Sequence, residues 1–203
     1  MLCDSADIGI GAAVHESARV WHLAQIRDGA TIEAGVVVGR GAYIGSGVRI
    51  GKNSKIQNFA LVYEPAVIGA GVFIGPAAIL TNDQRPRAVN PNGTLKSAND
   101  WEPVGVVVLE GASIGARAVC VAPVTVGSWS MVAAGAVVVT DVPDFALVVG
   151  VPARRIGWVG RSGSRLEKVE GSENLWVCPV TSVTFREVGS DELVELADSA
   201  GEL

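Results

Sequence analysis

The stretch AQIRDGATIEAGVVVGRGAYIGSGVRIGKNSKI, residues 24–56, carries an aliphatic residue at every sixth position. The same step extends in both directions and collects only large aliphatic residues: Ile8, Val14, Val20, Ile26, Ile32, Val38, Ile44, Ile50, Ile56, Val62, Ile68, Ile74 and Leu80. Two positions before each of them stands Ala, Val or Ser. A second block keeps the rule, with a cysteine at one position: Val108, Ile114, Cys120, Val126, Val132 and Val138. Repetition at a fixed short period is typical of a solenoid.

A period of six has a simple physical interpretation, a short strand followed by a turn. One aliphatic and one small residue of each hexad point inward, and three hexads close a triangular coil. Successive coils then pair as parallel strands at about 4.8 Å. The composition fits such a thin core, because aromatic residues make up only 5% of the chain while Gly occurs 25 times. We therefore expect an all-β fold, a parallel β-helix.

Glycine often follows the aliphatic residue of the hexad, as at Gly9, Gly39, Gly45, Gly51, Gly69, Gly75, Gly115 and Gly127. We interpret this as a turn position. The prediction is that these residues adopt backbone dihedral angles that cost other residues free energy.

The hexad register fails between Leu80 and Val108, whose separation of 28 is not a multiple of six. Residues 81–105 must therefore leave the prism, and a long polar excursion from a regular solenoid is usually functional. We expect residues 1–160 to form the β-helical domain, with the loop at 81–105. Residues 161–203 form a C-terminal accessory segment, in which 168–188 predict a β-hairpin and 191–198 a short helix.

Charge, cysteine and histidine content exclude several classes of protein. The net charge of −5 argues against non-specific nucleic-acid binding. No apolar run approaches the roughly 18 residues that span a bilayer, and residues 1–10 lack the basic start of a signal peptide. Three cysteines without metal spacing fit a reducing cytoplasm. Two histidines are too few for the three-His metal site of a γ-class carbonic anhydrase. We expect a cytoplasmic protein without metal, nucleic acid or membrane contact.

Several motifs on both sides of the loop form one set. Up to and within the loop they are Arg19-Val20-Trp21-His22, Lys55-Ile56-Gln57-Asn58, Phe73-Ile74-Gly75-Pro76, Thr81-Asn82 and Pro86-Arg87. Beyond the loop they are Ala134-Gly135-Ala136-Val137-Val138 and Val149-Gly150-Val151-Pro152-Ala153-Arg154-Arg155-Ile156-Gly157-Trp158. Together they resemble the bacterial nucleotide-sugar 3-N-acetyltransferases of the hexapeptide-repeat type. The resemblance covers about residues 5–165, implies an acyltransferase domain, and is strongest for the group that acetylates UDP-2-acetamido-3-amino-2,3-dideoxyglucuronate for surface polysaccharide.

This resemblance implies a left-handed β-helix and a homotrimer with active sites between subunits. It also implies transfer of an acetyl group from acetyl-CoA to an amine, at C3, of a nucleotide-linked amino sugar. Two departures leave the acceptor open: Phe59 stands where the family commonly has Asn, and Asp83 where it often has an apolar residue. The Asp form is similar to enzymes that acetylate dTDP-3-amino-3,6-dideoxyhexoses. The alternatives are such a dTDP-linked sugar, a 4-amino sugar, and a non-enzymatic β-helix scaffold.

The two histidines, His15 and His22, are poor candidates for a general base at the loop. His22 precedes Asn82 by about 60 residues, which is roughly 16 Å along the prism at the strand spacing. We therefore predict two catalytic residues in the loop. Asn82 orients the amine or polarises the thioester carbonyl, and Asp83 supplies a base if the loop buries it.

Candidates for acceptor binding are polar side chains at outward or turn positions near the loop. Counting back by 18 residues places Glu64 beneath Asn82, and Tyr63 beneath Thr81. A guanidinium in the loop suits a sugar carboxylate or a diphosphate. The predicted substrate-binding residues are Lys55, Gln57, Asn58, Tyr63, Glu64 and Arg87.

Coenzyme A carries a pyrophosphate and a 3′-phosphate, so its site needs positive charge. Arg154, Arg155, Arg161 and Arg165 concentrate such charge near the end of the prism. The small run Ala133-Ala134-Gly135 lets a pantetheine arm lie close to the backbone. With the family resemblance, the predicted acetyl-CoA-binding residues are Ala116, Arg117, Ala134, Gly135, Val151, Pro152, Arg154 and Arg155.

Overall fold

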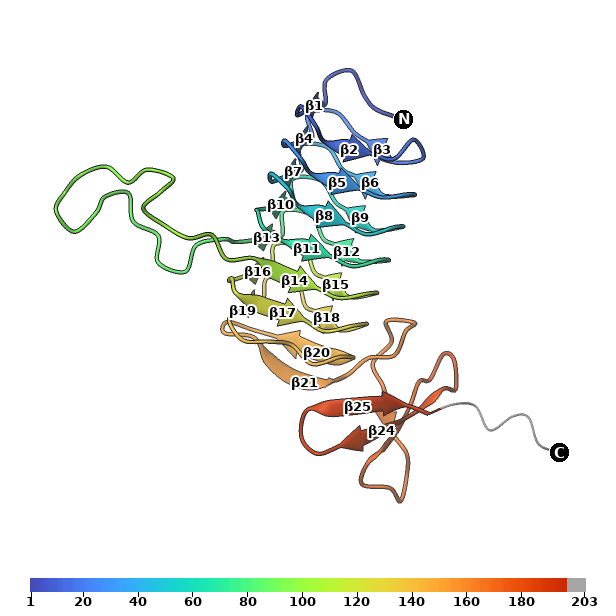
Figure 1. Ribbon diagram of the computed structural model, residues 1–203. Coiled ribbons are helices and arrows are strands. Elements are labelled where there is room, and N and C mark those ends of the chain that lie inside the picture. The colour runs from blue at the N-terminus through green and yellow to red at the C-terminus, as the bar shows by residue number, and fades with distance from the viewer. Residues whose placement is uncertain (197–203) are drawn as a thin grey trace.

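The chain folds into a triangular prism of stacked coils with a small sheet attached at its C-terminal end (Figure 1). The computed structural model describes residues 1–196. Each coil contributes one short strand to each of three sheets, and these sheets form the sides of the prism. The fold is the left-handed parallel β-helix that the hexad repeat and the resemblance predicted. No helix among the described residues is long and apolar enough to cross a bilayer.

The chain visits the three sheets in the order B, C, A. Sheet B contains β1 (Asp7–Ile8), β4 (Gln25–Ile26), β7 (Tyr43–Ile44), β10 (Leu61–Val62), β13 (Ile79–Leu80), β16 (Val119–Cys120) and β19 (Val137–Val138). Sheet C contains β2 (Ala13–Val14), β5 (Thr31–Ile32), β8 (Arg49–Ile50), β11 (Val67–Ile68), β14 (Val106–Val108) and β17 (Val124–Val126). Sheet A contains β3 (Arg19–Val20), β6 (Val37–Val38), β9 (Lys55–Ile56), β12 (Phe73–Ile74), β15 (Ser113–Ile114), β18 (Met131–Val132), β20 (Ala146–Val149) and β21 (Arg154–Trp158). We call the corners where the chain passes between sheets the AB, BC and CA edges.

The register between coils is the predicted step of 18 residues. Ile50 pairs with Ile68, and Val62 pairs with Leu80. Across the loop Ile68 pairs with Val108, so the prism continues as if residues 81–105 were absent. Ser54 is the one small inward residue of the first block that is polar, and it is satisfied, because its hydroxyl donates to Gly69 O at 2.9 Å and accepts from Val72 N at 3.0 Å.

The glycines that follow the aliphatic residues are required for space and not for their torsion angles, so the prediction about their dihedral angles was wrong. None of the eight has a positive φ; that conformation occurs two residues later, and non-glycine residues such as Asn53 and Ala77 also adopt it. At the glycines themselves the next coil leaves no room for a side chain. A Cβ on Gly51 would lie 2.6 Å from the carbonyl carbon of Gly69, and one on Gly75 would lie 2.6 Å from Ala116 N.

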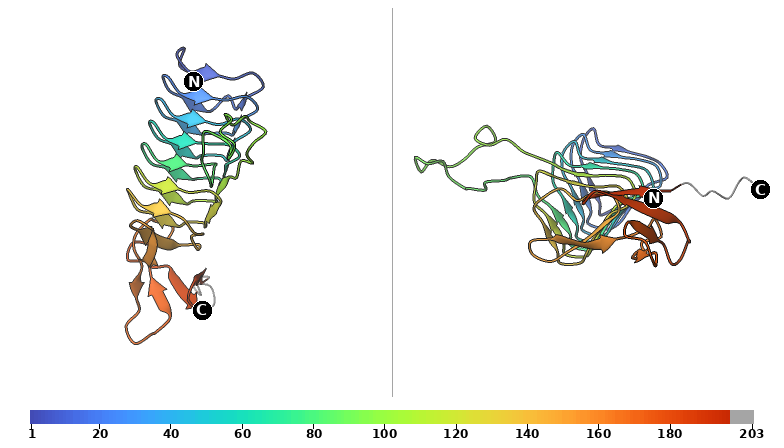
Figure 2. Two further views of the ribbon diagram at one scale, coloured as in Figure 1. Left: turned by 90° about the vertical axis from the view of Figure 1, so that its left-hand side faces the viewer. Right: turned by 90° about the horizontal axis from the view of Figure 1, so that it is seen from below.

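Residues 81–105 leave the prism at the BC edge and project outward as an arm (Figures 1 and 2). The base of the arm is closed by Val104 N, which donates to Asn82 O at 3.0 Å. Further out, Lys96 N donates to Ala88 O at 3.0 Å, so the arm has a hydrogen-bonded structure of its own. Leu95 on this arm is 78% exposed.

Four antiparallel strands follow the prism, in the order β22 (Glu167–Lys168), β23 (Leu175–Val177), β24 (Thr184–Val188) and β25 (Glu192–Glu195). The short helix expected at 191–198 is therefore wrong for its described part, and residues 197 and 198 lie outside the described residues. Burial alternates along β25, where Leu193 is buried while Glu192 and Val194 are exposed. This period of two suits a strand, and pairing with β24 stabilises it.

Arg155 and Arg161 tie this sheet to the end of the prism. The Arg155 guanidinium lies 4.1 Å from the ring centroid of the buried Trp158 and forms an ion pair with Glu187 at 3.5 Å. Arg161 pairs with Glu195 at 2.6 Å. The sheet is thereby held against the last strands of the prism.

Two glycine substitutions distinguish the effect of a steric clash from the effect of backbone torsion strain. Gly51→Ala should lower the free energy of unfolding by about 3 kcal/mol or more, because its Cβ meets the backbone of the next coil. Gly47 has φ near +68°, but no atom lies within 4 Å of the position that a Cβ would take. Gly47→Ala should therefore lower the free energy of unfolding by only about 1 kcal/mol, from left-handed backbone strain. Denaturant unfolding of both variants measures this order, and the reverse order would contradict the account.

Candidate functional site

The base of the loop places three predicted residues together on the BC edge. Because Val62 pairs with Leu80, Tyr63 lies under Thr81 and Glu64 under Asn82, as the register predicted. The Asn82 backbone is fixed by Val104, while its side-chain amide makes no hydrogen bond within residues 1–196. Thr81 is also fixed, since its Oγ1 accepts from Ala122 N at 3.0 Å. A half-buried amide on a rigid base is therefore available to a ligand.

Two residues that the sequence did not single out complete this cluster, Tyr43 and Arg27. The rings of Tyr43 and Tyr63 lie 5.1 Å apart at 45°. Burial raises the pKa of the Tyr43 phenol and the charge of Glu64 raises it further, whereas Arg27 lowers it. Tyr43 belongs to the column of Leu61, so counting by 18 from the loop did not reach it. Arg27 lies in the column of Tyr63, two coils below it, and counting on from Tyr63 would have found it.

The other predicted loop residues point elsewhere. Asp83 Oδ1 accepts a hydrogen bond from Arg85 N at 2.7 Å, and its side chain lines a hollow of about 340 Å³ inside the arm, together with Lys96 and Trp101. The exposed Arg87 donates from Nη1 to Pro86 O at 2.8 Å. Neither side chain is directed at the BC cluster within this chain, and their predicted roles stay predictions.

Gln57 and Asn58 lie on the AB edge, on the other side of sheet B. With Trp21, His22 and Arg40 they line a hollow of about 310 Å³. Counting along the axis separated His22 from the loop correctly but did not show that it shares a hollow with Gln57 and Asn58. Lys55, also predicted to bind substrate, lies exposed on the outer face of sheet A.

Four of the predicted acetyl-CoA-binding residues continue along the same AB edge. Ala116 and Arg117 occupy one coil and Ala134 and Gly135 the next, joined by a hydrogen bond of 2.9 Å from Gly135 N to Ala116 O. The side chains on this strip are small apart from Arg117, which is exposed and forms no ion pair within residues 1–196. The strip therefore offers open backbone beside a free positive charge.

The remaining predicted cofactor residues belong to the turn and strand that close the prism. Val151 is 72% exposed, and Pro152 follows it in the turn between β20 and β21. Arg154 is exposed and bonds only to Ala153 O at 2.8 Å among the described residues. Arg155 is engaged with Glu187 and Trp158, as described above. Arg154 is thus better placed than Arg155 to meet a phosphate.

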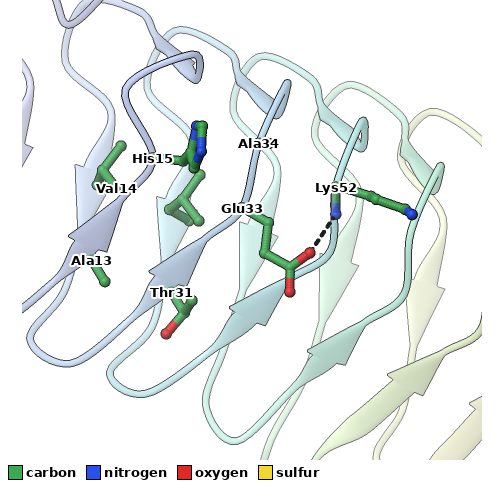
Figure 3. Close-up of a pocket in the computed structure, with 8 residues that line it drawn as sticks. Ala13, Val14, His15, Thr31, Glu33, Ala34 and Lys52 are labelled. Carbon is green, nitrogen blue, oxygen red and sulfur yellow. Dashed lines mark hydrogen bonds between the residues drawn. The ribbon is translucent and has the colours of Figure 1, made fainter.

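A further hollow of about 520 Å³ lies far from the loop on the N-terminal strands of sheet C (Figure 3). It is open, and its floor is made by small outward residues such as Ala13 and Thr31. At its rim, Lys52 N donates to the Glu33 carboxylate at 2.9 Å. No group of three or more His, Cys, Asp or Glu side chains suited to a metal ion occurs within residues 1–196. This hollow shows no chemistry comparable to that of the loop base.

Known proteins and families match this chain through its repeat. The model of the bacterial transferase hexapeptide (six repeats) matches residues 47–82, and that of the hexapeptide repeat of succinyl-transferase matches 24–40, 30–58 and 105–140. A solved structure, a hexapeptide transferase family protein from Anaplasma phagocytophilum, superposes with a TM-score of 0.60 over 76% of this chain and 84% of that chain. At 19% identity this likeness shows the fold.

Two curated relatives illustrate the sequence matches. The dTDP-3-amino-3,6-dideoxy-alpha-D-galactopyranose 3-N-acetyltransferase of Aneurinibacillus thermoaerophilus is 47% identical over 64 residues, which are 32% of this chain and 33% of that protein. The bifunctional protein GlmU of Alkalilimnicola ehrlichii is 31% identical over 175 residues, 84% of this chain and 36% of that protein. The matched regions thus span about a third of the length of these relatives. The repeat, the family models and the fold together show that the chain carries the hexapeptide repeat described for bacterial transferases, folded as a β-helix.

Proposed function

We propose that this protein is an N-acetyltransferase that moves an acetyl group from acetyl-CoA to the C3 amine of a nucleotide-linked amino sugar. The observation that carries the proposal is the arrangement around sheet B. A free amide, a carboxylate and two tyrosines lie on its BC edge at the loop base. A strip of small residues with a free arginine lies on its AB edge. The resemblance of these motifs to the nucleotide-sugar 3-N-acetyltransferases, and the curated relative of that type, support the same reaction.

Asn82 is the residue on which we expect the reaction to depend most. Val104 N donates a hydrogen bond to Asn82 O and so fixes the backbone from which the side chain extends. The side-chain amide itself has no hydrogen-bond partner within residues 1–196. An amide of this kind can accept a hydrogen bond from the amine or donate one to the thioester carbonyl. Asp83 is a second candidate if arm closure turns its carboxylate away from Arg85 N.

Acetyl-CoA is proposed to lie along the AB edge. The pantetheine arm needs close approach to backbone, which Ala116, Ala134 and Gly135 permit. Its phosphates need positive charge, which the exposed side chains of Arg117 and Arg154 supply. Val151 and Pro152 would contact the same ligand at the end of the prism.

We further propose that the active sites form between subunits of a homotrimer. In one chain the AB and BC edges lie at opposite sides of sheet B, and the arm projects away from its own prism (Figure 2). The exposed Leu95 on the arm would be covered by a neighbouring subunit. A cleft between two prisms would bring the BC edge of one subunit to the AB edge of the next.

The acceptor itself has a second candidate. The curated relative with 47% identity over 64 residues acts, by its name, on a dTDP-linked 3-amino-3,6-dideoxysugar, and Asp83 is similar to that group. A dTDP-linked deoxysugar is therefore the alternative to a UDP-linked uronate. A non-enzymatic scaffold is less well supported, because it does not account for the cluster at the loop base. A 4-amino sugar stays an alternative acceptor, which the panel of sugars below tests.

A thiol-release assay with acetyl-CoA and a panel of UDP- and dTDP-linked 3-amino and 4-amino sugars tests the function. We expect turnover with a 3-amino sugar and none with the matching 3-hydroxy sugar, because an amine is the nucleophile. The nucleotide preferred shows which acceptor class is correct. Absence of turnover on every 3-amino sugar would overturn the proposal.

Substitution of Asn82 tests its role. Asn82→Ala should lower kcat by about 10²- to 10³-fold, the effect typical of removing one donor from a charge-stabilising site. The affinity for CoA, measured by calorimetry, should not change, because CoA lies on the other edge. Asn99→Ala, an exposed asparagine of the same loop, is the matched control and should be active. Near-normal turnover of the Asn82 variant would remove this residue from the mechanism.

A further inference from the structure

Glu64 presents a buried carboxylate oxygen that nothing in the described chain satisfies. Its Oε2 atom is inaccessible to solvent and has no hydrogen-bond partner within residues 1–196. The atom packs against the backbone of Gly45 in the coil below, where even a Cβ would collide with it. Buried carboxylate oxygens without donors are costly. Oε2 faces the chain itself, whereas Oε1 is not among the buried unpartnered atoms, so a cation bound at Oε1 would offset part of this cost.

The surroundings of Glu64 favour a donor that carries positive charge. Arg27, the cation of the cluster, is already paired with Asp7 at 3.7 Å and forms no ion pair with Glu64. The rings of Tyr43 and Tyr63 lie 5.1 Å apart, the charge of Glu64 acts on the Tyr43 phenol, and aromatic rings attract cations. A carboxylate near an aromatic pair, with the nearby cation occupied elsewhere, suits an ammonium group.

We propose that Glu64, framed by Tyr43 and Tyr63, binds the ammonium form of the acceptor's amine and removes one of its protons. This inference rests on the proposed function and adds to it the base that the loop lacks. Asp83 is engaged with Arg85 N in the arm, and His22 lies on the AB edge. Glu64 is the carboxylate one coil beneath Asn82.

The proton and electron balance of the step is simple. An N–H bond of the ammonium breaks and an O–H bond forms on Glu64, which leaves a neutral amine with a lone pair beneath Asn82. The amine attacks the thioester carbon, a C–N bond forms and the C–S bond breaks. The second proton of the nitrogen passes to the departing thiolate, which leaves as CoA thiol.

Calorimetric binding of a nucleotide-linked 3-amino sugar and its 3-hydroxy counterpart tests the inference, at a pH where the amine is protonated. The wild-type protein should prefer the amino sugar by about tenfold or more, as expected for a charge-assisted hydrogen bond. Glu64→Gln should lose this preference while its affinities for the hydroxy sugar and for CoA stay unchanged. In the thiol-release assay its kcat should fall without a change in the KM for acetyl-CoA.

Glu33→Gln is the matched control, because Glu33 also follows an aliphatic residue at an edge but bonds to Lys52 N on the far side of the prism. It should keep the wild-type preference. If Glu64→Gln does not fold, Glu64→Asp, which withdraws the charge by one methylene, should weaken the preference. If the Glu64 variant that is measured keeps the full preference for the amino sugar, this inference is overturned and the proposed function is not. Failure of the wild-type protein to bind either sugar overturns it together with the proposed function.

Discussion

The backbones of successive coils approach one another closely at the glycine-bearing corners of the prism. Each coil hydrogen-bonds directly to the next, as where Gly51 N donates to Ile68 O at 2.8 Å, or Gly75 N to Ile114 O at 2.7 Å. At the corners where glycine follows the aliphatic residue, the backbone of the next coil leaves no room for a side chain. Inside the prism the same stacking leaves room for one aliphatic and one small residue per hexad, and this requirement gives the period of six.

Because stacking determines the interior and the glycine positions, chemistry is confined to outward side chains on the edges and to the arm. The BC edge at the loop base carries Asn82, Glu64 and Tyr63, whereas the AB edge carries the small strip with Arg117. These edges flank one sheet, so the proposed reaction needs two prisms side by side. The arm is internally hydrogen-bonded and extends away from its own prism, which is the geometry expected of an element that contacts a neighbour.

The repeat let the sequence predict the core residue by residue, as well as the departure of residues 81–105 and the position of Glu64 beneath Asn82. These predictions succeed because each follows from counting along a rigid solenoid. Counting could not show that the Tyr43 ring packs across columns against the Tyr63 ring. It also could not show that Arg155 is held by Glu187, more than thirty residues later. The strand β25 was mistaken for a helix because its four residues suit either conformation, and pairing with β24 decided between them.

Complementation between two damaged chains tests most directly the claim that one active site is built from two subunits. Asn82→Ala removes the amide at the loop base, and Ala134→Trp fills the exposed small strip on the AB edge. Each variant is mixed with itself and with the other under conditions of subunit exchange, and acetyl transfer is measured. The account predicts that the mixed sample regains activity that neither variant has alone, because some clefts then combine two intact edges. A mixture no more active than its better parent, with subunit exchange demonstrated, would contradict the account.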